Sequence, residues 1–143
     1  MIDDRSRPAP KRLIVRVLVP GVNAASMRAV NYAQTLGIPD TRAVHFAFSG
    51  EDARAIRSDW VTRGPRLPLD VDDAPYRDFG PPLLGYLRGL TADEEAAVLV
   101  ILPELVLSGW RRLLHNQRAL YVKRLLLFEP GVILASVPYQ LLR

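Results

Sequence analysis

Hydrophobic residues fall along this chain in five short runs, separated by segments with the periodicity of helices. The runs are nearly continuous and rich in β-branched residues, which is typical of strands buried on both faces of a sheet. They lie at residues 13–19, 42–48, 67–73, 96–102 and 131–137. Pro20 and Gly21 end the first run, Pro103 ends the fourth, and Pro68 weakens the third. The pattern therefore predicts five strands.

The segments between the runs predict helices with recognisable ends. Asn23 is a favourable N-cap for a helix that reaches Gly37. Ser49 and Asp52 form a capping-box pattern before a helix that Gly64 closes. The predicted helices lie at residues 24–37, 51–64, 83–90 and about 110–128.

Strand and helix alternate along the chain, which predicts the α/β class. We expect a doubly wound, mainly parallel five-stranded sheet with helices on both faces, because parallel neighbours need crossover connections. Residues 1–12 show no period and are expected to be a linker before a single domain at 13–143. In such folds ligands bind beyond the carboxyl ends of the strands, at the topological switch point. The segments expected there are 20–23, 48–52, 74–78 and 103–110.

The amino-acid composition indicates a folded domain and excludes several other classes of protein. The chain has 143 residues, of which 49% are hydrophobic and 24% charged, as in a folded globular domain. It has no cysteine, which excludes disulfides and thiolate metal sites, and two histidines cannot build a zinc site alone. No apolar run approaches the ~20 residues that span a bilayer. Residues 1–12 do not resemble a signal peptide, so a cytosolic chain is expected.

The motifs of common nucleotide-binding and hydrolytic enzymes are absent from the sequence. It contains no GxxxxGK[ST] loop, no GxGxxG after the first run and no GxSxG elbow. Asp70, Asp72 and Asp73 could hold magnesium, but a solvated strand end explains them more simply. His45 lies in an apolar run and is expected to be a hydrogen-bonded core histidine. We therefore do not expect an enzyme, a metal or a resident cofactor.

The last predicted helix is unusually basic. The formal net charge is +4, 17 of the 19 basic residues are arginines, and no acid lies between Glu104 and Glu129. Helical spacing places the polar side chains on one sector: Arg111, Arg112, His115, Asn116, Arg118 and Lys123. The expected buried face consists of Leu113, Leu114, Leu120, Tyr121, Leu125 and Phe128. Two explanations fit this pattern: a basic face in solvent, and a face that binds an anion. The absence of acidic residues favours the anion-binding face, but runs of charge are usually solvated, so both explanations stay open.

Two further groups suggest a nucleotide, each with a simpler alternative. Tyr76 and Arg77 pair an aromatic face with a guanidinium, which can stack a purine and hold its phosphate. A turn with a partly buried tyrosine explains the same residues. Asn23 begins a helix whose amino end would attract an anion, but capping alone needs no ligand.

Several stretches together resemble the cytosolic C-terminal domain of bacterial permeases of the amino acid–polyamine–organocation superfamily, including KUP-type potassium–proton symporters. The stretches are KRLIVRVLVPGVNAASMRAVNYAQTL, APYRDFGPPLLGYL, VLVILPELV, WRRLLHNQRALYVKRLLL and VPYQLL. The similarity extends from about residue 12 to the end, and its most specific signatures are "LLHNQ" and "PYR".

This resemblance implies a universal-stress-protein-like fold that follows transmembrane helices and dimerises at the cytoplasmic face of the cell membrane. In some potassium symporters of this group, cyclic di-AMP binds between the protomers and inhibits uptake. The glycine-rich ATP motif of the stress proteins is missing here, which disfavours ATP. DNA and RNA are not expected as partners.

The hypothesis from the sequence is therefore a regulatory domain of a potassium or amino acid permease that binds cyclic di-AMP. Tyr76 would stack adenine, the phosphates would be held by arginines, and hydrogen bonds would come from the remaining polar groups. The expected ligand-binding residues are Asn23, Tyr76, Arg77, Arg111, Arg112, His115 and Asn116. Two alternatives stay open. One is a ligand-free dimerisation module that pairs residues 131–137 across a two-fold axis. The other is a stand-alone ATP-binding stress protein or a small hydrolase of the same fold.

Overall fold

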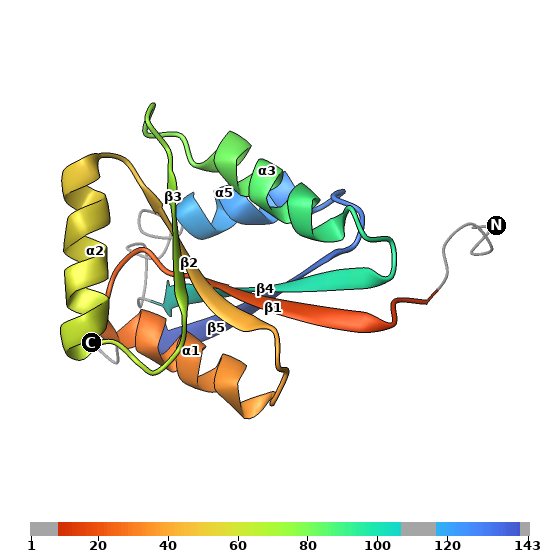
Figure 1. The fold of residues 1–143 in the computed structure, drawn as a ribbon, viewed down its shortest axis with the longest axis horizontal. Coiled ribbons are helices and arrows are strands. Elements are labelled where there is room, and N and C mark those ends of the chain that lie inside the picture. Colours follow the sequence, from red (N-terminus) through yellow and green to blue (C-terminus); the bar gives the residue numbers. More distant parts are fainter. Residues whose placement is uncertain (1–8, 107–116, 141–143) are drawn as a thin grey trace.

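Five parallel strands form the centre of the structure (Figure 1), in the order β3-β2-β1-β4-β5. The computed structural model describes residues 9–106 and 117–140. The strands are β1 (Arg12–Leu18), β2 (Thr41–Ala47), β3 (Leu69–Asp73), β4 (Ala96–Val106) and β5 (Val132–Gln140). The α/β fold with a parallel sheet is thus confirmed. The strand boundaries are within two residues of the prediction except at the carboxyl ends of β4 and β5.

Four helices that the structure describes cover the two faces of this sheet. They are α1 (Ala24–Thr35), α2 (Gly50–Arg63), α3 (Gly80–Thr91) and α5 (Gln117–Leu126). Buried side chains of α1 and α2, such as Val30 and Trp60, pack with Val15 and Val17 on one face. Leu83 of α3 and residues of α5 pack on the other face, so alternate residues of β1 enter two separate cores. The sheet is therefore doubly wound, with α3 and α5 above it and α1 below it in Figure 1.

The predicted helix ends at α1 and α2 are confirmed by their hydrogen bonds. The side-chain oxygen of Asn23 accepts from the Ser26 amide at 2.9 Å, and the chain turns at Gly37 with a positive φ of 65°. Ser49 Oγ accepts from the Asp52 amide at 3.0 Å. The return bond differs from that of a capping box, because Asp52 Oδ2 accepts from the Phe48 amide at 3.0 Å.

The prediction that Pro103 ends the fourth strand is wrong, since β4 continues to Val106 in register with β5. The N–H groups of a strand point alternately to its two neighbours. The Val98 amide donates to Gly131 on the β5 side, so the nitrogen of Pro103 faces β1. Pairing with β1 ends at Ile101. A proline is tolerated here because no neighbouring strand needs the N–H group that it lacks.

The buried side of α5 also differs from the prediction. Large apolar residues expected in the core are exposed: Leu120, Tyr121 and Phe128. Ala119, Val122 and Leu126 are buried instead, at the i, i+3 and i+7 spacing of one helical stripe. Leu125 packs against the core as expected, and Leu113 and Leu114 lie outside the described residues. Within the described parts of the chain, no helix has the length and apolar character needed to cross a bilayer.

Candidate functional site

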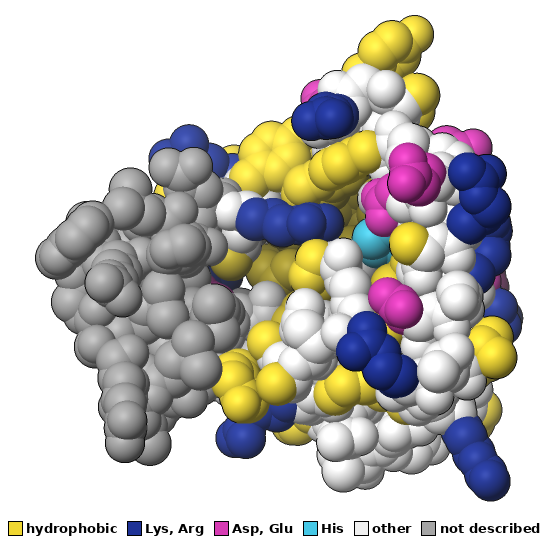
Figure 2. All heavy atoms as spheres, turned by 90° about the vertical axis from the view of Figure 1, so that its left-hand side faces the viewer, with side chains coloured by type: hydrophobic (Ala, Val, Ile, Leu, Met, Phe, Trp, Pro, Cys, Tyr) yellow, Lys and Arg dark blue, Asp and Glu magenta, His cyan; other side chains and the backbone are white. Residues whose placement is uncertain are grey.

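A cavity lies where the sheet changes its winding direction. The neighbouring strands β1 and β4 are followed by helices on opposite faces of the sheet. β1 leads to α1 on one face, while α5, which lies between β4 and β5 in the sequence, covers the other face. Ligands of open α/β sheets bind at such a switch point, outside the carboxyl ends of the strands. The cavity there has a volume of about 380 Å³. Figure 2 shows this end of the sheet, with hydrophobic side chains lining a hollow and charged side chains around it.

This switch-point cavity is lined by described residues of five elements, β1, α1, β4, α5 and β5, and of the segment after β1. Leu18 ends β1, Leu102 lies in β4 and Tyr139 in β5, while Asn23 and Arg118 come from the start of α1 and of α5. Most of the lining is apolar, and the polar groups are few, which is the usual composition of a small-molecule site. The sequence predicted a ligand site at the carboxyl ends of the strands. Of the segments expected there, 20–23 and 103–110 contribute described residues to the cavity, whereas 48–52 and 74–78 do not.

Of the predicted site residues that the structure describes, Asn23 lines the cavity. Its backbone is extended, and its side chain caps α1 through the Ser26 amide. The first N–H groups of a helix have no partner within the helix, and the helix dipole makes this end positive. Ala24 and Ala25, whose amides belong to this first turn, also line the cavity, and the turn contains no acidic residue.

Arg118 is the basic side chain among the described residues that line the cavity. Its guanidinium carbon lies 4.8 Å from the centre of the Phe79 ring, a cation–π arrangement. Burial lowers the pKa of the Arg118 guanidinium, and the negative charge of Asp52 partly opposes that effect. Among the described residues no carboxylate forms an ion pair with Arg118. Helical spacing predicted that Arg118 lies in the basic sector but gave it no ligand, because nothing in the sequence showed that its side chain faces the strand ends.

Tyr76 and Arg77 lie in the loop between β3 and α3 and do not line the cavity. The Tyr76 side chain is 90% exposed, and Arg77 has a φ of 56°, which is uncommon for a residue other than glycine. The same loop packs against α5 through Phe79, whose ring lies 5.3 Å from that of Tyr121. Tyr121 also donates to Asp78 Oδ1 at 2.9 Å. The loop therefore connects Tyr76 and Arg77 to the helix that carries Arg118.

The remaining predicted site residues are Arg111, Arg112, His115 and Asn116, and they lie outside the described residues. We had expected Lys123 to belong to an uncompensated basic sector, but its charge is compensated in the structure. Its Nζ pairs with Glu104 Oε1 at 3.2 Å, an acid supplied by β4 that the helical spacing could not show. Of the two basic residues of this sector that the structure describes, Arg118 lines the cavity and Lys123 pairs with Glu104.

His45 is a buried core histidine, as predicted. Its Nδ1 lies 2.8 Å from the Val19 carbonyl oxygen, and its Nε2 lies 3.1 Å from Asp52 Oδ1. A carbonyl only accepts, so Nδ1 carries a proton. Burial of Asp52 would raise its pKa, but hydrogen bonds from the Phe48 amide and His45 outweigh burial and lower it. These contacts hold the start of α2 against β1 and β2.

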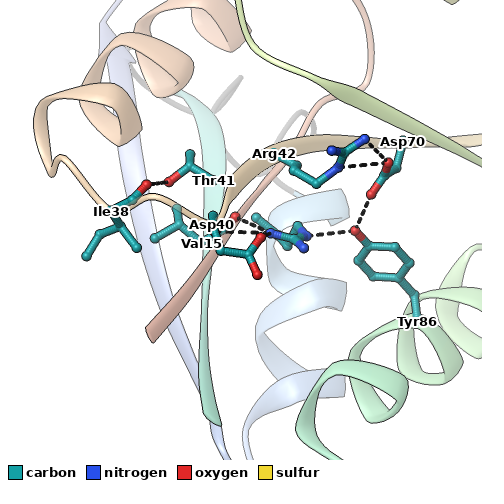
Figure 3. Close-up of polar contacts among 8 residues, drawn as sticks. Val15, Ile38, Asp40, Thr41, Arg42, Asp70 and Tyr86 are labelled. Carbon is teal, nitrogen blue, oxygen red and sulfur yellow. Dashed lines mark hydrogen bonds and ion pairs between the residues drawn. The ribbon is translucent and has the colours of Figure 1, made fainter. Parts of the chain in front are cut away.

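A polar network lies on the α3 face of the sheet (Figure 3). Arg16 of β1 is buried, and it donates to Tyr86 Oη and to Asp40 Oδ1, both at 2.8 Å. Tyr86 Oη donates to Asp70 Oδ2 at 2.7 Å, and Arg42 donates to Asp70 Oδ1. Burial and the Asp70 hydrogen bond raise the pKa of Tyr86 to about 12. The pKa of Asp70 is lowered, because hydrogen bonds from Arg42 and Tyr86 outweigh its burial.

This network also changes the interpretation of the acidic segment of β3. Asp70 was predicted to lie at a solvated strand end, with magnesium binding as the alternative. Its carboxylate is instead committed to Arg42 and Tyr86. In the described ranges, no group of three or more histidine, cysteine or acidic side chains is arranged to hold a metal ion.

The sequence of this chain is similar to part of a known transporter. The model of the family described as the KimA potassium transporter C-terminal domain matches residues 10–139. The potassium transporter KimA of Bacillus subtilis strain 168 is 26% identical over 142 residues. That similarity covers 96% of this chain but only 23% of the relative, so the chain spans about a quarter of that transporter's length.

Proposed function

Because the chain belongs to the family of KimA potassium transporter C-terminal domains, we propose that it is a cytosolic regulatory domain of a potassium transporter. The domain would bind a nucleotide second messenger, such as cyclic di-AMP, in a homodimer next to the transmembrane part. The observation that carries this proposal is the switch-point cavity, which joins an apolar lining to Arg118 and to the amino end of α1. Apolar walls suit a nucleobase, and the positive groups suit a phosphate.

Regulation would follow from a difference in ligand affinity between two arrangements of the transporter. A ligand shifts a conformational equilibrium only by the amount by which it binds one state better. Cyclic di-AMP carries two adenines and two phosphates, and it would therefore need groups beyond one cavity. Tyr76 and Arg77 supply an exposed aromatic face and a guanidinium on the loop that packs against α5. The basic residues expected at 111 and 112 would complete the phosphate contacts.

We predict that the purified domain binds cyclic di-AMP and that Tyr76→Ala weakens this binding at least tenfold. Stacking of one base on an aromatic side chain contributes ~1–3 kcal/mol, and Tyr76 is too exposed to support the fold. Isothermal titration calorimetry measures the affinity, and a ligand at 100 times its dissociation constant should stabilise the domain by ~2.7 kcal/mol in thermal unfolding.

The matched control for this titration is Tyr32→Ala, which removes another partly exposed tyrosine, from the later turns of α1. It should bind cyclic di-AMP like the wild type. ATP is titrated in parallel. Absence of heat and of a thermal shift with cyclic di-AMP would reject the proposed ligand, and binding of ATP alone would favour the stress-protein alternative.

A ligand-free dimerisation module is the second candidate function, and the exposed edge of β5 favours it. β5 is the last strand of the sheet, so one row of its backbone groups has no partner strand among the described residues. Ile133 on this strand is 54% exposed, and Leu127 and Phe128 between α5 and β5 are exposed as well. A second copy that pairs with β5 would cover both the backbone edge and these side chains.

We predict that the domain is a dimer at micromolar concentration and that Ile133→Lys makes it monomeric, because a buried lysine in a strand-pairing interface is strongly unfavourable. Analytical ultracentrifugation measures the mass. Val61→Lys is the control, since Val61 is an equally apolar residue that is exposed on α2. A wild-type monomer, or a dimer that persists in Ile133→Lys, would show that β5 does not form the interface.

A further inference from the structure

We infer that the first turn of α1 and the guanidinium of Arg118 form a subsite for one phosphate group inside the switch-point cavity. The nucleobase attached to that phosphate would lie against the apolar walls of the same cavity. The inference rests on the proposed function for the class of its ligand, a nucleotide. It adds where the phosphate binds and which residues hold it. The sequence indicated that the amino end of α1 would attract an anion and placed Arg118 in a basic sector, but it did not bring the two together.

The amino end of α1 provides donors and positive potential. α1 has 12 residues, and the amides of its first turn have no partner inside the helix. The Asn23 side chain occupies the Ser26 amide, which leaves Ala24 and Ala25 to offer their N–H groups to a ligand. Both residues line the cavity, and neither has a side chain large enough to fill it. The absence of an acid from this turn keeps the helix end positive.

Ser26 is an independent sign that this end of the cavity takes a polar ligand. The residue is fully buried, it belongs to the cavity lining, and its hydroxyl oxygen has no hydrogen-bond partner among the described residues. Buried polar groups without partners are uncommon in folded proteins, and each one calls for an explanation. A phosphate oxygen at the start of α1 would give this hydroxyl an acceptor after a small adjustment of the helix end.

Arg118, at the start of α5, also lines the cavity. The stacking of its guanidinium on Phe79, at 4.8 Å, restrains the side chain and leaves its planar edge available for a phosphate. Glu104 also lines the cavity, but its carboxylate pairs with Lys123 Nζ at 3.2 Å. Glu104 therefore does not neutralise Arg118, and the more distant carboxylate of Asp52 acts on Arg118 only through its charge, without an ion pair among the described residues.

The rest of the lining fits the flat apolar part of a nucleotide. Leu18, Leu102, Pro103 and Ala119 face the space beside Arg118. A volume of about 380 Å³ falls within the range of small-molecule sites. Apolar walls also strengthen the interaction of a phosphate with Arg118 and the helix end, because charges attract more strongly where water is excluded.

The test compares AMP with adenosine by isothermal titration calorimetry, since the two ligands differ only in the phosphate. The wild-type domain should bind AMP at least tenfold more tightly than adenosine. Ala24→Glu should abolish this preference, because it places a carboxylate where the phosphate would lie. An acid in the first turn of a helix is favourable for the helix, so this variant should fold at least as well as the wild type. Ala24→Gln, which has the same size without the charge, should retain most of the preference.

Arg118→Gln tests the guanidinium and should also remove the preference for AMP. Its control is Arg124→Gln, which takes the same charge from an exposed position of α5 that does not line the cavity. Thermal unfolding of each variant shows whether it folds. If Arg118→Gln does not fold, the pair of Ala24 variants decides. Equal binding of AMP and adenosine by the wild type, or an unchanged preference in Ala24→Glu, would overturn the subsite.

Cyclic di-AMP titrations separate this inference from the proposed function. If cyclic di-AMP binds the wild type and Ala24→Glu equally well, the proposed function stands and the subsite is wrong. If AMP shows the predicted preference but cyclic di-AMP does not bind, the subsite stands and the proposed ligand is wrong. If neither nucleotide binds the wild type, both are wrong.

Discussion

Replacing Phe46 with alanine is expected to lower the free energy of unfolding by about 4 kcal/mol, within the range for buried aromatic residues. Phe46 lies in β2, a central strand, and only 1% of its surface is exposed. Its ring meets that of Tyr86 edge to face, with centres 6.2 Å apart. Removal of the ring leaves a cavity between β2 and α3 that the rigid sheet cannot close. Urea unfolding followed by circular dichroism measures the change.

The matched control is Phe48→Ala. Phe48 follows β2 two residues after Phe46, but 36% of its surface is exposed. Its contact with Asp52 uses the backbone amide and survives the substitution. We expect a loss of about 1 kcal/mol or less, because exposed substitutions have small effects. Equal losses in the two variants would mean that Phe46 is not part of a packed core between the sheet and α3.

The parts of the fold that the sequence predicted correctly depend on neighbouring residues. Residues 13–19 are apolar at nearly every position, since the two faces of β1 enter the two cores. The caps Asn23 and Ser49 bond to amides three residues later in the chain, so their signal is local. The alternation of strands and helices predicted a parallel sheet with any ligand beyond the carboxyl ends of its strands, but it did not predict the order of the strands.

The predictions that were wrong depend on contacts between distant segments. A proline normally ends a strand. Here β1 stops pairing with β4 before Pro103, so no neighbouring strand needs the N–H group that Pro103 lacks. The buried stripe of α5 contains Ala119 and Val122 because the sheet sets which side faces inward, and side-chain size did not indicate this. Lys123 seemed uncompensated because its partner, Glu104, belongs to another element.

At the candidate site too, the features that depend on neighbouring residues were predicted, and those that depend on contacts between distant segments were not. The sequence indicated the carboxyl ends of the strands as the place of a site, and it named Asn23 but not Ser26 or Arg118, because packing decides which side chains line the cavity. Arg118 is oriented by Phe79, which precedes α3, and Ser26 is isolated from hydrogen-bond partners only by the tertiary structure. Tyr76 and Arg77 do not line this cavity and Tyr76 is exposed, so their contact with a ligand stays a prediction.

Disrupting the polar network on the α3 face is expected to lower the stability of the domain strongly. We expect Arg16→Ala to lower the free energy of unfolding by about 3 kcal/mol, because removing one partner from a buried ionic network leaves the others poorly solvated. Arg16 is 5% exposed and connects β1 to Asp40 and to Tyr86 on α3. Alanine also removes the apolar stem of the side chain, so packing is lost together with the hydrogen bonds.

Arg12→Ala on the same strand is the control for Arg16→Ala. Arg12 forms an ion pair with Asp93 at 3.1 Å, but both side chains are about half exposed, and such surface pairs contribute ~0–1 kcal/mol. Arg16→Met separates packing from charge, since methionine restores the apolar volume without the hydrogen bonds. A loss in Arg16→Met close to that in Arg16→Ala would assign the effect to the hydrogen bonds with Asp40 and Tyr86. Losses no larger in Arg16→Ala than in Arg12→Ala would mean that burial adds nothing to this ion pair, and that α3 is held to the sheet by its apolar contacts alone.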